Sequence, residues 1–337
     1  MATTNTNRQR RFLGVTLFFV ISLVFICGLT ALLIRSAFNS ERRESKPVLG
    51  GAAAETFVEL PGDRAYPGAL TIGPDGNIYA GSFCTGDIWQ ITPEGERATW
   101  VKGGSKTIQA ASGMAFAPDG SLYVIDRKDC NPRRGQGQIK RISPDGQTVE
   151  QVGKLDNDEL PHSITFDKDG VLYFTDTQRG TILRLNDGGE YETWWVLPEV
   201  SNEVQPTGLA YDAVTDDIVV ADTAAGIVYR LDFEADRSPK LLGTVYSEDD
   251  RELDGLTIDD LGRVIFTIYD TNKVARIELN GEITILAEDF REPSDVAYLD
   301  GTVYVTNLDS ISLAPIISFL VDPSLPFTID KITLPAE

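Results

Sequence analysis

Two side chains able to exchange protons begin similar segments of this chain. His162 is the only histidine, and an imidazole with a pKa of about 6.5 can act as a general base or bind a metal ion. Asp254 precedes Gly255 in another such segment, where a carboxylate can bind a cation with help from its neighbours. Both residues also have a structural interpretation, His162 as a hydrogen-bonded polar residue in a channel and Asp254 as a loop cap.

Several other chemistries are excluded by the motifs. The chain has no G-x-S-x-G nucleophile elbow, and a single histidine leaves little scope for a catalytic triad. Gly103–Thr107 lacks the glycines of a phosphate-binding loop, and Gly135–Gly137 lacks the third glycine and the helix of a dinucleotide site. We therefore expect no nucleotide cofactor.

The residues that begin these segments belong to an internal repeat. Six segments, each an apolar strand, a turn and a second apolar strand, start at Gly68, Ser112, His162, Thr207, Asp254 and Ser294. The starts are 44, 50, 45, 47 and 40 residues apart, which is the spacing of propeller blades. Asp-Gly pairs such as Asp75-Gly76 suit tight hairpins because glycine accepts a positive φ. The repeat predicts an all-β, six-bladed β-propeller over residues 55–337.

This architecture places two rings of side chains at one end of the central channel, which we call the mouth. The inner ring consists of the six segment starts, and the second ring consists of the residues that end the second strands. Polar groups converging on a channel end are a default binding site. Beside His162, Asp254 and Thr207, the expected binding residues are Ser112, Asp126, Asp176, Asp222, Ser294 and Asn307. The three aspartates of the second ring also suit local turns, since their carboxylates can accept backbone N–H bonds.

Two segments compete to close the ring. Glu55–Pro61 resembles the outer strand Glu192–Pro198 and could complete the last blade, but Phe327–Pro335 could fill the same place. The sequence leaves both possibilities open, and predicts that one of them is an additional edge strand.

The loops at the mouth carry two further features. Cys84 and Cys130 lie in matching loops of adjacent blades, so they are candidates for a disulfide or for two separate buried thiols. The loop Arg127–Gly135 brings four positive charges to an acidic protein. These charges could steer an anionic substrate or balance local carboxylates.

The N-terminal part of the chain differs sharply from the rest. Phe12–Ile34 contains 23 uncharged, mostly apolar residues, and a helix of this length, about 35 Å, can span a bilayer. We expect a tail at 1–11, a single transmembrane helix at 12–34, a linker at 35–54 and an extracytoplasmic propeller. The net charge is −21, which disfavours nucleic-acid binding. The expected partners are the membrane and a small molecule or protein at the mouth of a monomeric propeller.

Two blade segments resemble a known family. TGLAYDAVTDDIVVADT at Thr207–Thr223 and LDGLTIDDLGRVIFT at Leu253–Thr267 are similar to segments of the senescence-marker-protein/gluconolactonase/regucalcin family of six-bladed propellers. The resemblance covers residues 55–337 and implies a metal-assisted lactone hydrolase. Family members with this activity hold a divalent cation through a Glu, one or two Asn and an Asp. Only Asp254 matches, because Gly68, His162 and Thr207 stand at the other positions.

The resemblance therefore implies a membrane-anchored, gluconolactonase-like propeller with a degenerate metal site. Asp254 and Thr207 are its expected ligands for Ca²⁺ or another divalent cation, with Asp254 polarising a lactone or ester carbonyl. His162 is then the general base or an additional ligand. The alternative is a non-catalytic propeller of the NHL-repeat type that binds a ligand or a protein at the same mouth.

Overall fold

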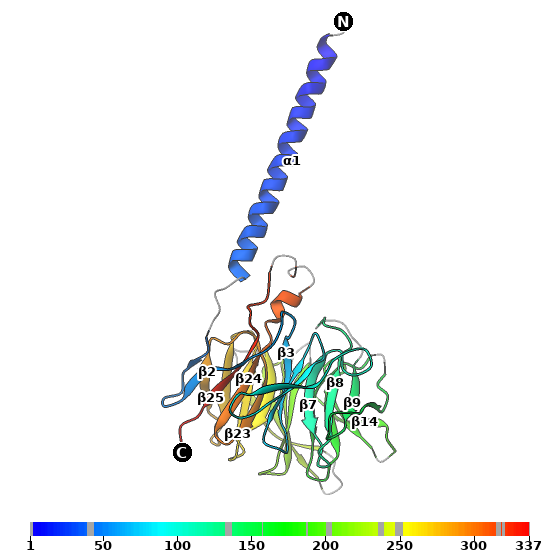
Figure 1. Cartoon of the computed structure of the whole chain (residues 1–337), viewed down its shortest axis with the longest axis vertical. Coiled ribbons are helices and arrows are strands. Elements are labelled where there is room, and N and C mark those ends of the chain that lie inside the picture. Colours follow the sequence, from blue (N-terminus) through cyan, green and yellow to red (C-terminus); the bar gives the residue numbers. More distant parts are fainter. Residues whose placement is uncertain are drawn as a thin grey trace. The chain divides into compact units, whose positions relative to one another are not determined.

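A computed structural model describes residues 3–38, 44–131, 137–156, 158–186, 188–199, 204–234, 239–246, 252–314, 318 and 321–336. It contains one long helix and a ring of β-sheets, and Figure 1 colours these elements along the sequence. The helix α1 (Thr3–Phe38) includes a candidate membrane span, Val15–Leu33, with a mean hydropathy of 2.6 and no buried side chains. It begins inside the expected tail and ends beyond the expected span of 12–34.

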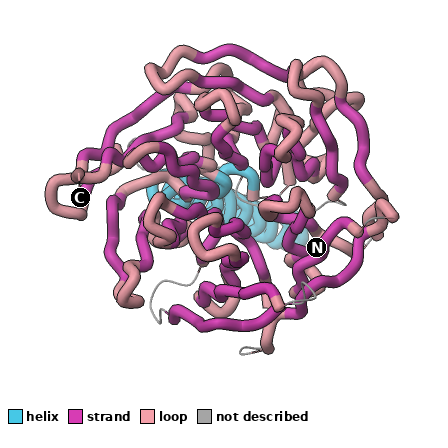
Figure 2. The backbone as a smooth tube through the Cα atoms, turned by 90° about the horizontal axis from the view of Figure 1, so that it is seen from below, coloured by secondary structure: helices cyan, strands magenta, loops and turns pink. Residues whose placement is uncertain are grey.

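The described part of the chain forms six antiparallel sheets, which are the blades of a six-bladed β-propeller. Figure 2 shows them arranged around a common axis. The predicted fold is thereby confirmed. Blade 1 comprises β3 (Pro67–Ile72), β4 (Ile78–Ser82), β5 (Ile88–Ile91) and β6 (Arg97–Val101). Blade 2 comprises β7 (Ala111–Phe116), β8 (Leu122–Asp126), β9 (Gln138–Ile142) and β10 (Val149–Val152). Blade 3 comprises β11 (Pro161–Phe166), β12 (Leu172–Asp176), β13 (Thr181–Leu185) and β14 (Tyr191–Val196).

The remaining blades follow the same order, from an inner strand at the axis to an outer strand. Blade 4 comprises β15 (Pro206–Asp212), β16 (Asp217–Asp222), β17 (Ile227–Phe233) and β18 (Pro239–Tyr246). Blade 5 comprises β19 (Leu253–Ile258), β20 (Val264–Ile268), β21 (Lys273–Ile277) and β22 (Ile283–Glu288), with β1 (Lys46–Pro47) at its edge. Blade 6 comprises β23 (Pro293–Leu299), β24 (Thr302–Asn307), β25 (Thr328–Thr333) and β2 (Ala53–Glu59). A short 3₁₀ helix, η1 (Ser310–Leu313), follows β24.

The ring is closed by both of the candidate segments together. The sheet order of blade 6 is β2-β25-β24-β23, so β25 is its third strand and β2 is its fourth (Figure 1). The expectation that one of the two segments is an additional edge strand was wrong, because the last blade has only two strands before β25. The added edge strand is instead β1, which pairs with β22. Strand residues thus lie within the range 35–54 assigned to the linker.

Aromatic side chains fill most of the space between blades. Tyr79 of blade 1 packs edge-to-face on Phe116 of blade 2 with ring centroids 4.9 Å apart, and Tyr123 of blade 2 packs on Phe166 of blade 3 at 5.0 Å. Such pairs add to the free energy gained by burying their apolar surface. The stacked blades hold the inner strands rigidly around the axis, where the candidate site lies.

Candidate functional site

The inner strands bring His162 and Asp254 together at the mouth. Each is the second residue of its strand, His162 in β11 of blade 3 and Asp254 in β19 of blade 5. The two side chains meet over the intervening blade 4, with His162 Nε2 3.4 Å from Asp254 Oδ1. Their side chains are 25% and 16% exposed, so the pair is accessible but mostly enclosed. We call this contact the His162–Asp254 pair.

Glycines allow the inner strands to approach closely enough for this contact. A Cβ atom on Gly208 of blade 4 would lie 2.2 Å from the carbonyl oxygen of Asp254, and one on Gly113 of blade 2 would lie 2.5 Å from that of His162. Both distances are shorter than any tolerated contact. Any side chain at these positions would therefore push the strand that carries Asp254 or His162 away from its neighbour.

Burial drives both members of the pair toward their neutral forms. Desolvation, and then repulsion from Asp295 and Glu252, raises the pKa of Asp254 well above its usual range. Desolvation, and then the charge of Arg127, lowers the pKa of His162 to about 3. Both shifts favour the neutral forms, which are a protonated carboxyl group beside an uncharged imidazole. This places a proton donor and a proton acceptor next to one another.

Arg127 and Tyr269 complete the polar surroundings of the pair. Arg127 directly follows β8, is 4% exposed, and has a pKa lowered by burial to about 10. Burial, and then the negative charge of Glu292, raises the pKa of the Tyr269 phenol, whose oxygen is hydrogen-bonded to the hydroxyl of Ser310. Sequence reasoning named Arg127 only as part of a charged loop, of which residues 132–136 lie outside the described residues. Tyr269 was not predicted, because blade 5 lacks a polar residue at the end of its second strand.

A polar cavity of about 260 Å³ extends along the axis beyond the pair. It is lined by the third to sixth residues of the inner strands from all six blades, including Asp295, Ser163 and Thr165. Burial raises the pKa of Asp295 to about 7, although its carboxylate accepts backbone N–H bonds from Leu70 and Val296. Asp295 is a second carboxyl group in the channel, beside Asp254, and it was not predicted from the sequence. Its signal was a lone acidic residue inside an apolar inner strand.

The other expected residues of the inner ring have structural hydrogen bonds. The Thr207 hydroxyl donates to the carbonyl oxygen of Leu253 at 2.8 Å. The Ser294 hydroxyl donates to the carbonyl oxygen of Pro67 at 3.3 Å. Each bond ties an inner strand to the next blade. Ser112 is 9% exposed and its hydroxyl has no hydrogen-bond partner among the described residues. Thr207 and Ser294 therefore hold neighbouring blades together, and their expected roles in binding stay predictions.

The second ring is also structural. Asp126, Asp176, Asp222 and Asn307 are at most 1% exposed. Asp222 accepts backbone N–H bonds from Gln205, Ala224 and Ala225, and the other three accept similar bonds from residues of the adjoining loops. Their bonded oxygens order the mouth loops, while the Oδ2 atoms of Asp176 and Asp222 are buried without a hydrogen-bond partner among the described residues. The expectation that these four residues bind a ligand stays a prediction.

The side chains present do not fit the divalent cation that the family resemblance implies. Among the described residues, no group of three or more His, Cys, Asp or Glu side chains is arranged to hold a metal ion. The Thr207 hydroxyl is used by Leu253, and the nearest neighbour of Asp254 is an imidazole nitrogen. A catalytic metal usually has at least three protein ligands, so the described side chains around Asp254 do not provide a complete set.

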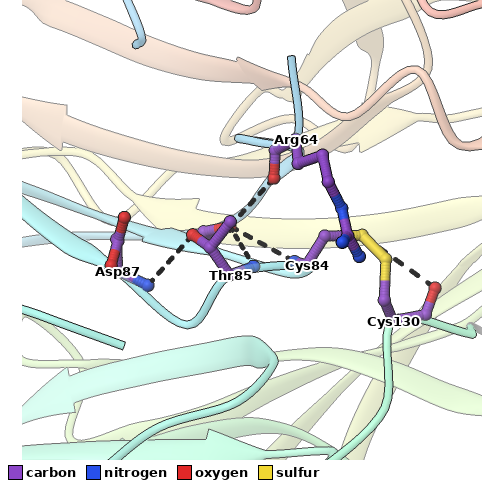
Figure 3. The surroundings of a disulfide bond; sticks show 6 residues. Arg64, Cys84, Thr85, Asp87 and Cys130 are labelled. Atoms are coloured by element: carbon purple, nitrogen blue, oxygen red, sulfur yellow. Dashed lines mark hydrogen bonds between the residues drawn. A yellow bond between two sulfur atoms is a disulfide. The ribbon is translucent and has the colours of Figure 1, made fainter. Parts of the chain in front are cut away.

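A disulfide between Cys84 and Cys130 links the mouth loops of blades 1 and 2 (Figure 3). Their Cα atoms are 4.5 Å apart. The loop of Cys84 is ordered by the hydroxyl of Ser82, which accepts the N–H groups of Cys84 and Thr85 at 3.2 and 2.9 Å. The disulfide therefore ties the loop that follows Arg127 in blade 2 to the Cys84 loop of blade 1.

The ring resembles solved propellers of different functions. A virginiamycin B lyase from Staphylococcus aureus, solved with quinupristin, has a TM-score of 0.59 and 18% identity over 88% of this chain and 97% of its own. A gluconolactonase from Xanthomonas campestris has a TM-score of 0.62 and 14% identity over 88% and 96%. An auxiliary nutrient binding protein from Bacteroides ovatus has a TM-score of 0.60 and 10% identity over 83% and 76%. No protein-family model and no curated protein sequence matches the chain. At these identities the likeness shows the propeller fold, which lyase, lactonase and binding proteins share.

Proposed function

We propose that this propeller hydrolyses a lactone or a related ester at its mouth, with His162 and Asp254 as the catalytic base and acid. The observation that carries the proposal is the 3.4 Å contact between His162 Nε2 and a carboxyl group of raised pKa. Pairs of groups whose pKa values are displaced toward the neutral forms are typical of acid–base catalysis. The gluconolactonase and lyase neighbours support a catalytic use of this fold.

The neutral pair can complete a hydrolysis cycle. His162 Nε2 takes a proton from water as the water oxygen attacks the ester carbonyl carbon. Asp254 gives its proton to the alkoxide oxygen as the carbon–oxygen bond breaks, which yields a carboxylic acid and an alcohol. The imidazolium then returns its proton to the Asp254 carboxylate across the same contact. Arg127 lies close enough to influence the charge of His162, and its positive charge stabilises the tetrahedral oxyanion.

The experiment measures turnover of sugar lactones, acyl lactones and aryl esters by the full-length protein in detergent. His162→Gln and Asp254→Asn are expected to lower kcat by about 10²–10⁴-fold, while Glu94→Gln, an exposed turn residue of blade 1, serves as the matched control. The expected pH profile of kcat/KM falls on the alkaline side, because Asp254 must keep its proton. Turnover that survives both site variants would refute the assigned roles.

Each assay is repeated with EDTA and with added Ca²⁺, Mn²⁺ or Zn²⁺. The acid–base mechanism predicts that turnover is unchanged by EDTA. Activity that disappears with EDTA and returns with one of the cations would restore the metal-assisted alternative, with Asp254 as a ligand.

A ligand-binding propeller without turnover is the second candidate. It is favoured by the polar cavity of about 260 Å³ along the axis, which can hold a small ligand whether or not it reacts, and by the nutrient-binding neighbour. A compound from the same panel that raises the melting temperature but is recovered unchanged would identify this function, since a ligand that binds only the folded state stabilises it.

We also propose that α1 anchors the chain in a membrane, with the propeller on the extracytoplasmic side. The apolar span Val15–Leu33 supports the anchor, and the Cys84–Cys130 disulfide supports an oxidising compartment. The test is protease treatment of intact cells or sealed vesicles, followed by alkaline extraction. A propeller that is cleaved from outside and a helix that stays in the membrane pellet are expected, and a propeller protected until the membrane is broken would reverse the orientation.

A further inference from the structure

A recess lies between blades 4 and 5, away from the inner-strand residues of the candidate site. Its volume is about 490 Å³. Its apolar wall includes Val219 and Val228 of blade 4 and Val264 and Ile277 of blade 5. Arg230 and Asp217 provide polar groups beside this wall. A recess of this size, mostly apolar with a few placed polar groups, is typical of a small-molecule site.

The other blades show what normally fills this space. In blades 1, 2, 3 and 6 the second strand carries a tyrosine at the position that faces the next blade, and in blades 1, 3 and 6 the outer strand adds a second aromatic ring. Tyr79 packs on Trp100 at 5.1 Å between ring centroids, Tyr173 on Trp194 at 4.9 Å, and Tyr304 on Phe57 at 5.0 Å. These pairs occur in blades 1, 3 and 6.

Blade 4 has aliphatic residues at the corresponding positions. Val219 pairs with Arg230 in the same register in which Tyr79 pairs with Gln90. The inner strand of blade 5 offers Ile258, where blade 2 offers Phe116 to Tyr79. The recess therefore occupies the space that aromatic rings fill between other blades.

Blade 4 nevertheless has polar groups at the place where the tyrosine hydroxyl is bound in blade 1. In blade 1 the Tyr79 hydroxyl donates to Asp75 at 3.0 Å and accepts from Gln90 at 2.8 Å. In blade 4 the cross-strand position is held by Arg230, which donates to Asp212 at 2.6 Å, to Asp217 at 2.8 Å and to the carbonyl oxygen of Gly262 at 3.0 Å. The guanidinium and two carboxylates thus stand where a phenol hydroxyl is received in blade 1.

We propose that the recess between blades 4 and 5 binds a small phenolic ligand. The ring lies against Val219, Val228 and Val264, in the place of the absent tyrosine ring. The hydroxyl exchanges hydrogen bonds with the Arg230 and Asp217 groups. The site is separate from the His162–Asp254 pair, and its occupancy does not require that the protein be a hydrolase.

The probe is p-cresol, which has the shape of a tyrosine side chain, with toluene as its counterpart without the hydroxyl. Binding to the full-length protein in detergent is measured by isothermal titration calorimetry against detergent blanks. We expect a Kd for p-cresol of about 0.1–1 mM, a range reasonable for a ligand of this size. Toluene is expected to bind roughly tenfold more weakly, because it has no hydroxyl group to form hydrogen bonds with Arg230 and Asp217.

Two variants test the location. Val219→Tyr places the ring in the recess and is expected to weaken p-cresol binding at least about tenfold, and Val219→Phe serves if that variant does not fold. Tyr79→Val opens the equivalent space in blade 1 and is expected to add a second p-cresol site. No heat of binding at millimolar p-cresol, or unchanged binding to the folded Val219 variants, would overturn the proposal. Equal binding of toluene and p-cresol would overturn the assignment to phenols.

Discussion

Replacing both Cys84 and Cys130 by alanine is expected to destabilise the propeller substantially. The disulfide joins residues 46 apart in sequence. In the chain-entropy treatment, the cross-link restricts the unfolded chain, and a closed loop of this length contributes about 4 kcal/mol at 25 °C. The native contacts change little, because the two cysteines lie in loops and the backbone of the Cys84 loop is also held by the Ser82 hydroxyl.

The predicted loss converts into a measurable shift of the melting temperature. A propeller of roughly 280 residues unfolds with an entropy of about 0.6 kcal/mol/K, so the loss of 4 kcal/mol lowers the melting temperature by about 7 °C. The assay is scanning calorimetry of the full-length protein, with and without dithiothreitol. Reduction of the unmodified protein should reproduce the shift of the double variant and leave the double variant unchanged.

The remaining cysteine provides the matched control. Cys27 is a free cysteine in α1, so Cys27→Ala should leave the melting temperature unaltered. A melting temperature of the double variant within about 1 °C of the parent would refute the entropic reasoning, since the loop length alone predicts a shift several times larger. Titration of three free thiols in the folded parent would refute the disulfide itself.

Substitutions at three further positions test the channel and its supports. Burial raises the pKa of Asp295 to about 7, so folding takes up a proton between about pH 4 and 7. The free energy of unfolding therefore falls as the pH rises through that window, and urea titrations at pH 5 and 8 should show that Asp295→Asn removes about 2–4 kcal/mol of this loss. Gly208→Ala should cost about 1–3 kcal/mol in the same assay and lower turnover, since its Cβ would lie 2.2 Å from the Asp254 carbonyl oxygen. Asp222→Ala should lower the melting temperature while Asp222→Asn, which keeps an acceptor oxygen, changes it little; a loss of ligand binding in a fully stable Asp222→Asn would contradict its structural role.

The blades were predictable because each repeats a local pattern. An apolar strand, a short turn (Asp-Gly in four of the six cases) and a second apolar strand identify one hairpin, and six such hairpins at blade spacing leave few other folds. The closure was not predictable in the same way. The third and fourth strands of a blade have the same short alternating pattern. The sequence therefore does not indicate that Thr328–Thr333 is the third strand of the last blade and Ala53–Glu59 the fourth.

The candidate site was predictable in composition but not in contacts. His162 and Asp254 were identified from their places at the starts of inner strands. That their side chains meet depends on how closely three inner strands approach one another, which is set by glycines such as Gly208. Asp222 is a case in which the position of a residue was predicted but the partners of its side chain were not. An aspartate at a strand end reads the same whether its carboxylate faces a ligand or, as here, three backbone N–H groups.

The protonation of Asp254 decides between the two chemistries of this channel. A carboxylate that binds a cation must give up its proton, but burial and the nearby Asp295 and Glu252 raise the pKa of Asp254. Burial therefore favours a proton over a cation on this carboxyl group, and Gly68 and Thr207 offer no acidic ligand beside it. Protons and cations then compete for one oxygen pair, so raising the pH should weaken acid catalysis and strengthen cation binding together. Turnover that instead rises with pH, in step with cation occupancy, would assign Asp254 to a metal and His162 to its supporting shell.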